Sequence, residues 1–216
     1  MRKKYLICLV AVCILFLGIA IGSFCNYILY PVSVENVKSR LSYDSEWKDN
    51  IIEVKIDNLD KMGVQLFCAF DQYPQAYFLV NHFSDICLMD GSTIRGDLIC
   101  QDYNGDGEYE LLYMSQHAPA SFTTPYLYVY KVKDGKIQLI SVTHFKGQPG
   151  HEWKLISKDG ELFIQNECYP EYDMYVKYEN GAWKVEGERA EEIEIYDNTE
   201  YYQTESKESK WRLKDF

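Results

Sequence analysis

Three short turn sequences constrain the fold of this chain more than any other feature. Asp134-Gly135, Asp159-Gly160 and Asn180-Gly181 each separate two segments in which apolar and polar residues alternate. Such pairs are strong signals for two-residue β-hairpins, because both turn residues take a positive φ. The turns recur at intervals of about 20 to 25 residues with no helical pattern between them. They predict an antiparallel meander.

Segments of strand length continue this pattern over most of the chain, and β-branched and aromatic residues are frequent in them. The segments are IIEVKI from residue 51, VQLFCAF from 64, QAYFLVNHF from 75, PYLYVYKV from 125, KIQLISVTHF from 136, HEWKLIS from 151, ELFIQNECY from 161, YDMYVKY from 172 and AWKVEG from 182. About ten strands are too few for a complete propeller, which normally needs four or more blades of four strands. We therefore expect an all-β domain over residues 51–197, either a propeller-like fragment or a compact β-sandwich.

The N-terminal region predicts a membrane anchor. Residues 5–30 contain no charged side chain and follow a basic start at residues 2–4. A spanning helix needs about 20 predominantly apolar residues, whereas the apolar core of a secretory signal has about 7 to 15. Since Lys and Arg stay on the cytoplasmic side, we predict one transmembrane signal-anchor at 5–30, with residues 1–4 in the cytoplasm and the domain outside it. Cleavage near Ala20–Gly22 is the alternative and would give a secreted protein.

The charge and composition bound the partners of the domain. The net charge of −11 repels phosphate backbones, so nucleic acid is not an expected partner. It favours metal cations and basic partners instead. A content of 47% hydrophobic and 15% aromatic residues is enough to build a core. Polar segments flank the domain: residues 31–50, expected to form a stalk or a short helix, and residues 198–216, expected to form a tail.

The segment QDYNGDGEYE, residues 101–110, concentrates four acidic side chains just before an apolar run. Calcium takes six to eight oxygen ligands, and a tight loop can supply them from alternate residues. Gly107 allows the sharp turn that such a loop requires. The expected calcium ligands are Asp102, Asn104, Asp106, Glu108 through its backbone carbonyl, and Glu110.

The loop is not an EF-hand. An EF-hand needs a bidentate Glu at the twelfth position and flanking helices, whereas the twelfth position here is Tyr113. The flanking segments DLIC and YELLYM have the character of strands. The sequence therefore predicts a strand–loop–strand calcium site.

Electrostatics favours a cation in this loop. Four carboxylates in one tight loop repel one another, and no Lys or Arg lies between Gly96 and Lys131 in the sequence. A divalent cation would relieve this repulsion, and extracellular calcium supports weak sites of about 10⁻⁴ to 10⁻³ M. The alternative is an acidic hairpin turn without a metal.

The loop pattern resembles the FG-GAP/VCBS-type repeats of integrin-like β-propellers. The residues that carry the resemblance are Asp102, Asn104, Asp106, Gly107, Glu110, Leu111 and Leu112. It covers about 20 residues and implies a calcium ion bound between two strands of a blade. The family usually carries several repeats, whereas this chain contains a single copy of the loop.

Other residues offer weaker signals for chemistry. The histidines are His82, His117, His144 and His151. The segment HFKGQPGHEW places His144 near His151 and Glu152, but its glycines and proline indicate a loop. Tyr126, Tyr128 and Tyr130 fall on one face of a strand, where aromatic residues form either a core or a binding stripe.

The cysteines of the outer domain leave two possibilities open. They are Cys68, Cys87, Cys100 and Cys168. In an oxidising compartment four cysteines allow three disulfide pairings, and buried thiols are the alternative. No C-x-x-C spacing indicates a zinc site.

Together these patterns predict a membrane-anchored, extracytoplasmic, calcium-binding β module without catalytic activity that binds a protein or glycan partner. One alternative is a cell-surface hydrolase that uses the His144–Glu152 loop. Another is an accessory subunit that completes a propeller with a second chain, for which an exposed edge strand would be a sign.

Overall fold

The computed structural model describes residues 32–40, 50–70, 74–81, 86–89, 96–117, 124–146 and 153–208. Within these ranges the chain is all-β and forms three antiparallel sheets, which confirms the predicted fold class at this level. The anchor predicted at residues 5–30 lies outside the described residues. Among the residues that are described, no helix is both long and apolar enough to span a membrane.

Each sheet is built on a meander of four consecutive strands. The first sheet contains β1 (Ile51–Val54), β2 (Val64–Phe70), β3 (Pro74–Asn81) and β4 (Ile86–Leu88). The second contains β5 (Gly96–Gln101), β6 (Glu110–His117), β7 (Thr124–Lys133), β8 (Lys136–Lys146) and, beside β8, β13 (Glu194–Asp197). The third contains β9 (Trp153–Lys158), β10 (Glu161–Asn166), β11 (Met174–Glu179) and β12 (Ala182–Glu186). The helical segments are α2 (Val34–Arg40), α3 (Thr199–Glu208) and the 3₁₀ turns η2 (Leu59–Met62), η3 (Pro170–Tyr172) and η4 (Ala190–Glu192).

The three predicted hairpins are confirmed. They join β7 to β8, β9 to β10 and β11 to β12 in antiparallel pairs. Both residues of each turn have a positive φ, as the two-residue hairpin requires. The φ values are 53° and 73° at Asp134 and Gly135, 54° and 84° at Asp159 and Gly160, and 54° and 82° at Asn180 and Gly181.

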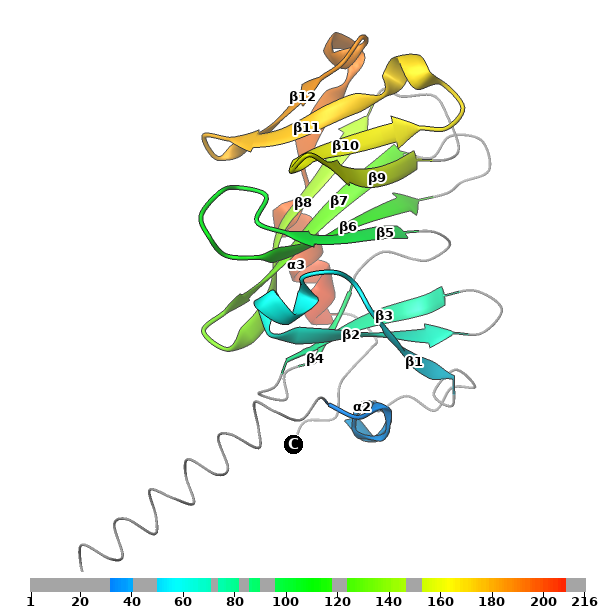
Figure 1. Ribbon diagram of the computed structural model, residues 1–216, viewed down its shortest axis with the longest axis vertical. Coiled ribbons are helices and arrows are strands. Elements are labelled where there is room, and N and C mark those ends of the chain that lie inside the picture. Colours follow the sequence, from blue (N-terminus) through cyan, green and yellow to red (C-terminus); the bar gives the residue numbers. More distant parts are fainter. Residues whose placement is uncertain are drawn as a thin grey trace, which may run out of the picture.

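The sheets stack face to face in chain order, with the second sheet between the other two (Figure 1). Because the central sheet is covered on both faces, the LLYM run of β6 is buried throughout. Leu111 and Tyr113 pack against Leu66 and Leu79 of the first sheet. Alternate residues Leu112 and Met114 belong to a second core with Trp153, Leu155, Ile164 and Met174 of the third sheet.

The tyrosine stripe of β7 belongs to the core between the first two sheets. Tyr128 and Tyr130 are buried, and Tyr126 packs against the same cluster. Tyr128 contacts Tyr113 of β6 at a centroid distance of 5.9 Å and Tyr202 of α3 at 5.3 Å. The stripe is therefore a packing surface.

Both ends of the described chain are attached to the stack. The α2 helix buries Val37 against Phe67 and Phe78 on the outer face of the first sheet. Just before it, the Val32 N–H donates to Gln65 Oε1 at 2.6 Å. At the other end, β13 pairs with β8, and the Asn198 N–H donates to the Val142 carbonyl at 2.8 Å.

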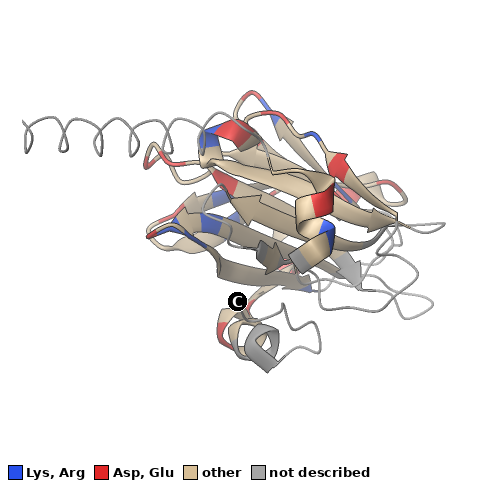
Figure 2. Ribbon diagram, turned by 90° about the horizontal axis from the view of Figure 1, so that it is seen from below, with Lys and Arg blue, Asp and Glu red and all other residues tan. Residues whose placement is uncertain are grey.

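The outer face of the third sheet is charged. Lys177 lies 3.2 Å from Glu161 and 3.4 Å from Glu186, and these ion pairs are exposed. They surround the ring contact of Phe163 with Tyr175 at 4.9 Å. Figure 2, which views the molecule from the side of the first sheet, shows acidic and basic residues interspersed along loops and strand ends there as well.

A partly buried polar contact joins the second and third sheets. The Asp97 carboxylate of β5 accepts a hydrogen bond from the Leu155 N–H of β9 at 2.7 Å. Burial raises the pKa of Asp97, and the bond from Leu155 only partly offsets it. Nearby, the Ser157 hydroxyl donates to Gln101 Oε1 at 2.8 Å. Edge strand β5 is therefore fixed to edge strand β9 by side chains.

Asp97→Ala removes the acceptor for the Leu155 N–H and should lower the free energy of unfolding by about 1 to 3 kcal/mol. Asp97→Asn keeps an acceptor oxygen and should lose less.

Because the folded-state pKa of Asp97 is raised, the folded state holds this proton more tightly than the unfolded state. The stability of the wild type relative to Asp97→Asn should therefore fall as the pH rises from about 4 towards neutrality. Urea denaturation between pH 3 and 7 measures this difference, and a flat difference would contradict it.

Candidate metal centre

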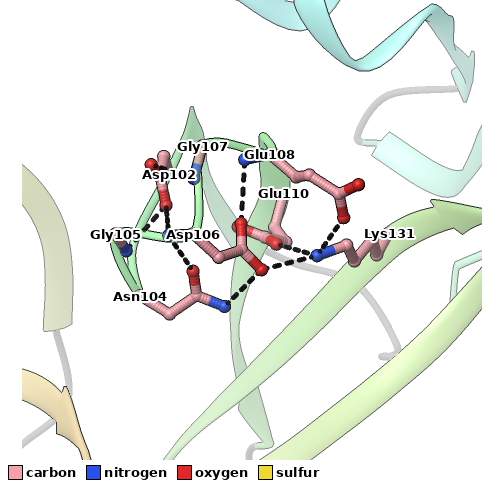
Figure 3. Close-up of polar contacts among 8 residues, drawn as sticks. All are labelled: Asp102, Asn104, Gly105, Asp106, Gly107, Glu108, Glu110 and Lys131. Atoms are coloured by element: carbon pink, nitrogen blue, oxygen red, sulfur yellow. Dashed lines mark hydrogen bonds and ion pairs between the residues drawn. The ribbon is translucent and has the colours of Figure 1, made fainter.

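The acidic loop connects β5 to β6 and is folded around the carboxylate of Asp102 (Figure 3). Asp102 Oδ1 accepts hydrogen bonds from the N–H groups of Gly105 at 2.7 Å and Asp106 at 3.1 Å. Asp102 Oδ2 accepts another from Gly107 at 2.9 Å. Gly105 and Gly107 have φ values of 73° and 86°, which side chains other than glycine rarely adopt. These two glycines turn successive N–H groups towards one carboxylate.

Further side-chain bonds hold the acidic residues in place. Asn104 Oδ1 accepts from the Asp106 N–H at 3.0 Å, and Asn104 Nδ2 donates to Asp106 Oδ2 at 3.2 Å. Asp106 Oδ1 accepts from the Glu108 N–H at 2.8 Å. Hydrogen bonds within the loop therefore hold both oxygens of the Asp106 carboxylate, independently of residues from other strands.

Three carboxylates of the loop converge on the ammonium group of Lys131 (Figure 3). Lys131 Nζ lies 2.9 Å from Asp106 Oδ2, 2.6 Å from Glu108 Oε2 and 3.0 Å from Glu110 Oε1. Lys131 reaches the loop because β7 pairs with β6 in a register that sets Leu111 opposite Tyr130. Its side chain is only 16% exposed. A single positive group therefore sits where three negative groups meet.

Glu110 is the buried member of this cluster. Its side chain is 0% exposed, and Oε2 has no hydrogen-bond partner among the described residues. Burial raises the pKa of Glu110, and Lys131 opposes that rise. By contrast, the hydrogen bond from Lys131 lowers the pKa of the exposed Asp106. For Lys131, burial alone would lower the pKa, but hydrogen bonds to Glu108, Asp106 and Glu110 together raise it.

Two tyrosines attach the loop to the outer sheets. Tyr103 stacks on Trp183 of β12 with centroids 5.1 Å apart and contacts Tyr178 of β11 at 5.2 Å. Burial raises the pKa of Tyr103 to about 12. On the other side, the Tyr109 hydroxyl accepts a hydrogen bond at 2.9 Å from Lys61. Lys61 belongs to η2, which connects β1 to β2 in the first sheet. The loop therefore belongs to the second sheet but contacts elements of the first and the third.

The structure brings the five predicted ligand residues together in one loop but gives them different roles. The side chains of Asp106, Glu108 and Glu110 face one cationic group, whereas those of Asp102 and Asn104 bond within the loop. For Glu108 the sequence predicts a backbone ligand, and the structure directs its carboxylate to the cation instead.

The sequence alone does not predict the contact of Lys131 with the acidic loop. Lys131 is 21 positions away from Glu110 in the sequence. The hairpin-like pairing of β6 with β7 makes them neighbours. The aromatic content of β7 predicts the strand, but only its register relative to β6 would have identified Lys131.

The chemistry of the donor set fits a hard cation. Carboxylate and amide oxygens are the ligands that calcium takes, and each carboxylate oxygen that accepts an N–H retains a further lone pair. Glu110 Oε2 is a buried acceptor that has no hydrogen-bond partner in the part of the chain that the structure describes. In the described ranges, however, no group of three or more His, Cys, Asp or Glu residues is arranged to hold a metal ion, and the ammonium group of Lys131 stands where the three carboxylates meet. A metal would have to take the place of the ammonium group.

Among the described residues, the other candidates form no second cluster. His144 of β8 lies flat against Tyr126 at a centroid distance of 4.2 Å. His151 and Glu152, the other members of the proposed hydrolase loop, lie outside the described residues, as does His82. Cys68, Cys87, Cys100 and Cys168 are not joined by disulfides, and burial raises the pKa of Cys100 to about 12.

Comparison with protein-family models, with curated proteins and with solved structures gives no match to this chain. The resemblance to FG-GAP/VCBS-type repeats therefore rests on the loop residues alone.

Asp102→Ala should destabilise the metal-free protein by about 1 to 3 kcal/mol, because three N–H groups lose their charged acceptor. Asp102→Asn keeps one acceptor oxygen and should cost less. Urea denaturation in the presence of EDTA measures both variants. Equal stability of Asp102→Ala and the wild type would show that the loop is not held by this carboxylate.

Proposed function

We propose that this chain is a membrane-anchored, extracytoplasmic calcium-binding β module that binds a protein or glycan partner and has no catalytic activity. The observation that carries the proposal is the convergence of three carboxylates on one cation position, 2.6 to 3.0 Å from Lys131 Nζ. Oxygen ligands lie 2.3 to 2.6 Å from calcium, so a similar arrangement with a slight contraction would suit the ion.

The proposed ligand residues are the five that the loop sequence predicts, with Glu108 acting through its carboxylate in place of its backbone carbonyl. Asp106, Glu108 and Glu110 would supply the carboxylates that now meet at Lys131. Asp102 and Asn104 accept loop N–H groups and would add oxygens through their remaining lone pairs. Calcium would supply two positive charges where Lys131 now supplies one. The second charge matters most for Glu110, because its buried carboxylate has lost its hydration and its pKa is raised despite the contact with Lys131.

The proposed role of calcium is structural. The loop contacts η2 through Tyr109 and β12 through Tyr103. Its conformation therefore affects the packing of the second sheet against both the first and the third. A ligand that binds only the folded state stabilises it in proportion to the logarithm of its concentration over the dissociation constant. Calcium would thus tighten the contacts among all three sheets.

The finer architecture that we propose is a propeller-like fragment. Its support is that each sheet is a four-strand meander and that the sheets stack in chain order. Successive propeller blades have this organisation, whereas a sandwich packs two sheets. The single loop that resembles an FG-GAP/VCBS repeat lies in the middle sheet.

The proposed location follows from the apolar segment at residues 5–30 and the basic residues before it. Val32 and α2 pack on the outer face of the first sheet. The domain would therefore begin immediately after the anchor, with the first sheet nearest the membrane. Cleavage of the segment would instead release the same domain.

A binding role is favoured over hydrolysis by the surroundings of His144. Its ring is stacked on Tyr126 in a plane only 4° away, which is a packing arrangement. Exposed aromatic residues are Tyr196 of β13, which is 42% exposed and lies beside His144 with ring centroids 6.1 Å apart, and Tyr201 of α3, which is 60% exposed. Exposed aromatic side chains are frequent in protein and glycan interfaces, so this edge of the second sheet is the proposed contact surface.

Calcium should raise the midpoint of thermal unfolding of the full chain in a mild detergent. At ten times the dissociation constant the gain is about 1.4 kcal/mol, which corresponds to roughly 3 to 6 °C for a domain of this size. Differential scanning fluorimetry in EDTA and in millimolar calcium measures the shift.

Asp106→Ala should abolish this response, because it removes one of the three converging carboxylates. Asp57→Asn is a matched control, since Asp57 is exposed and lies outside the loop. An equal response to calcium in Asp106→Ala and the control, or none in the wild type, would refute a calcium site in this loop.

A further inference from the structure

We propose that Lys131 is a built-in competitor for the calcium site, so that calcium binds by exchange with the Lys131 ammonium group. This inference rests on the proposed function and adds the regulation of the same site. It assigns the metal-free state a defined structure, in which Lys131 neutralises the loop, and it makes the calcium affinity depend on a residue of another strand.

The contacts show that Lys131 and a metal would need the same position. Lys131 Nζ is within 3.0 Å of carboxylate oxygens from Asp106, Glu108 and Glu110. Those oxygens are three of the proposed ligands, and a second cation among them would lie against a positive charge. Calcium and the ammonium group therefore exclude each other, both by space and by repulsion.

A second observation points to a cation other than the ammonium group. Glu110 is 0% exposed, and its Oε2 atom has no hydrogen-bond partner in the described structure. An ammonium group has three protons to donate, and here it serves three separate carboxylates. A cation that takes six to eight oxygens could also engage the second oxygen of Glu110.

The exchange requires no movement of a strand. Lys131 lies on β7, held by its pairing with β6 and β8, but its ammonium group is carried by a flexible four-carbon stem. The carboxylates of Asp106 and Glu108 are exposed, so the ammonium group can leave towards solvent. The loop itself stays folded, because Asp102 holds its backbone without help from Lys131.

The consequence is a site that fills only at high calcium concentration. Part of the binding free energy of calcium is used to displace Lys131, which weakens the apparent affinity relative to an uncompeted loop. Sites of about 10⁻⁴ to 10⁻³ M are typical of extracellular modules. Without calcium the same lysine prevents mutual repulsion of the carboxylates, so the domain does not depend on the metal in order to fold.

The test is a calcium titration of the full chain in detergent, monitored by isothermal calorimetry and, separately, by Trp fluorescence. Trp183 reports on the loop because its ring stacks on Tyr103. Lys131→Met removes the competing charge and keeps the apolar stem. Lys131→Arg keeps the charge. Lys133→Met is the matched control, because Lys133 lies two residues along the same strand and is exposed.

Lys131→Met should bind calcium at least about tenfold more tightly than the wild type, while Lys131→Arg and Lys133→Met keep the wild-type affinity. In EDTA, Lys131→Met should melt at a lower temperature than the wild type, because its carboxylates have lost their counter-ion. If this variant is unfolded in EDTA, circular dichroism should show that calcium restores its structure.

The outcomes separate this inference from the proposed function. If the wild type binds calcium and Lys131→Met binds it equally or more weakly, the exchange is refuted and the calcium site stands. If only Lys131→Met binds calcium, Lys131 blocks the site permanently, and both the exchange and the proposed calcium-binding function of the wild type are refuted. If neither binds calcium, both proposals fail.

Discussion

The structure depends on how it neutralises the negative charge placed at the junction of its three sheets. The loop that joins β5 to β6 gathers Asp106, Glu108 and the buried Glu110 around one ammonium group. A buried carboxylate is tolerated only if a positive charge or hydrogen bonds compensate for its lost hydration. Because Tyr103 and Tyr109 attach this loop to the neighbouring sheets, the state of the charged cluster bears on the packing of the whole stack.

Two kinds of contact hold the stack together, and they respond differently to changes of pH and of bound ions. The apolar layers between the sheets depend on area and shape, and they include fully buried residues such as Trp153 and Tyr128. The polar contacts at the strand edges, such as Asp97 with Leu155 and the Lys131 cluster, depend on charge. A change of bound ion or of pH therefore alters the contacts at the edges of the sheets, whereas the apolar layers contribute the same stability under all these conditions.

Much of this architecture could be predicted from the sequence, because its signals are local. Asp134-Gly135 and its two counterparts specify hairpins through backbone conformation alone, and VQLFCAF coincides with β2. The division into three sheets could not be predicted, since it depends on which strand edges remain unpaired. The same limit applies to the site: the loop residues form a local pattern, whereas Lys131 enters through the register of β7 against β6.

The most direct test of the account is terbium luminescence, because this ion can occupy calcium sites and is excited by nearby aromatic rings such as Tyr103. The wild-type chain should show sensitised terbium emission that calcium suppresses at millimolar concentration, and Glu110→Gln should weaken it. Emission that calcium does not suppress, or that Glu110→Gln leaves unchanged, would contradict the claim that these carboxylates form a calcium site.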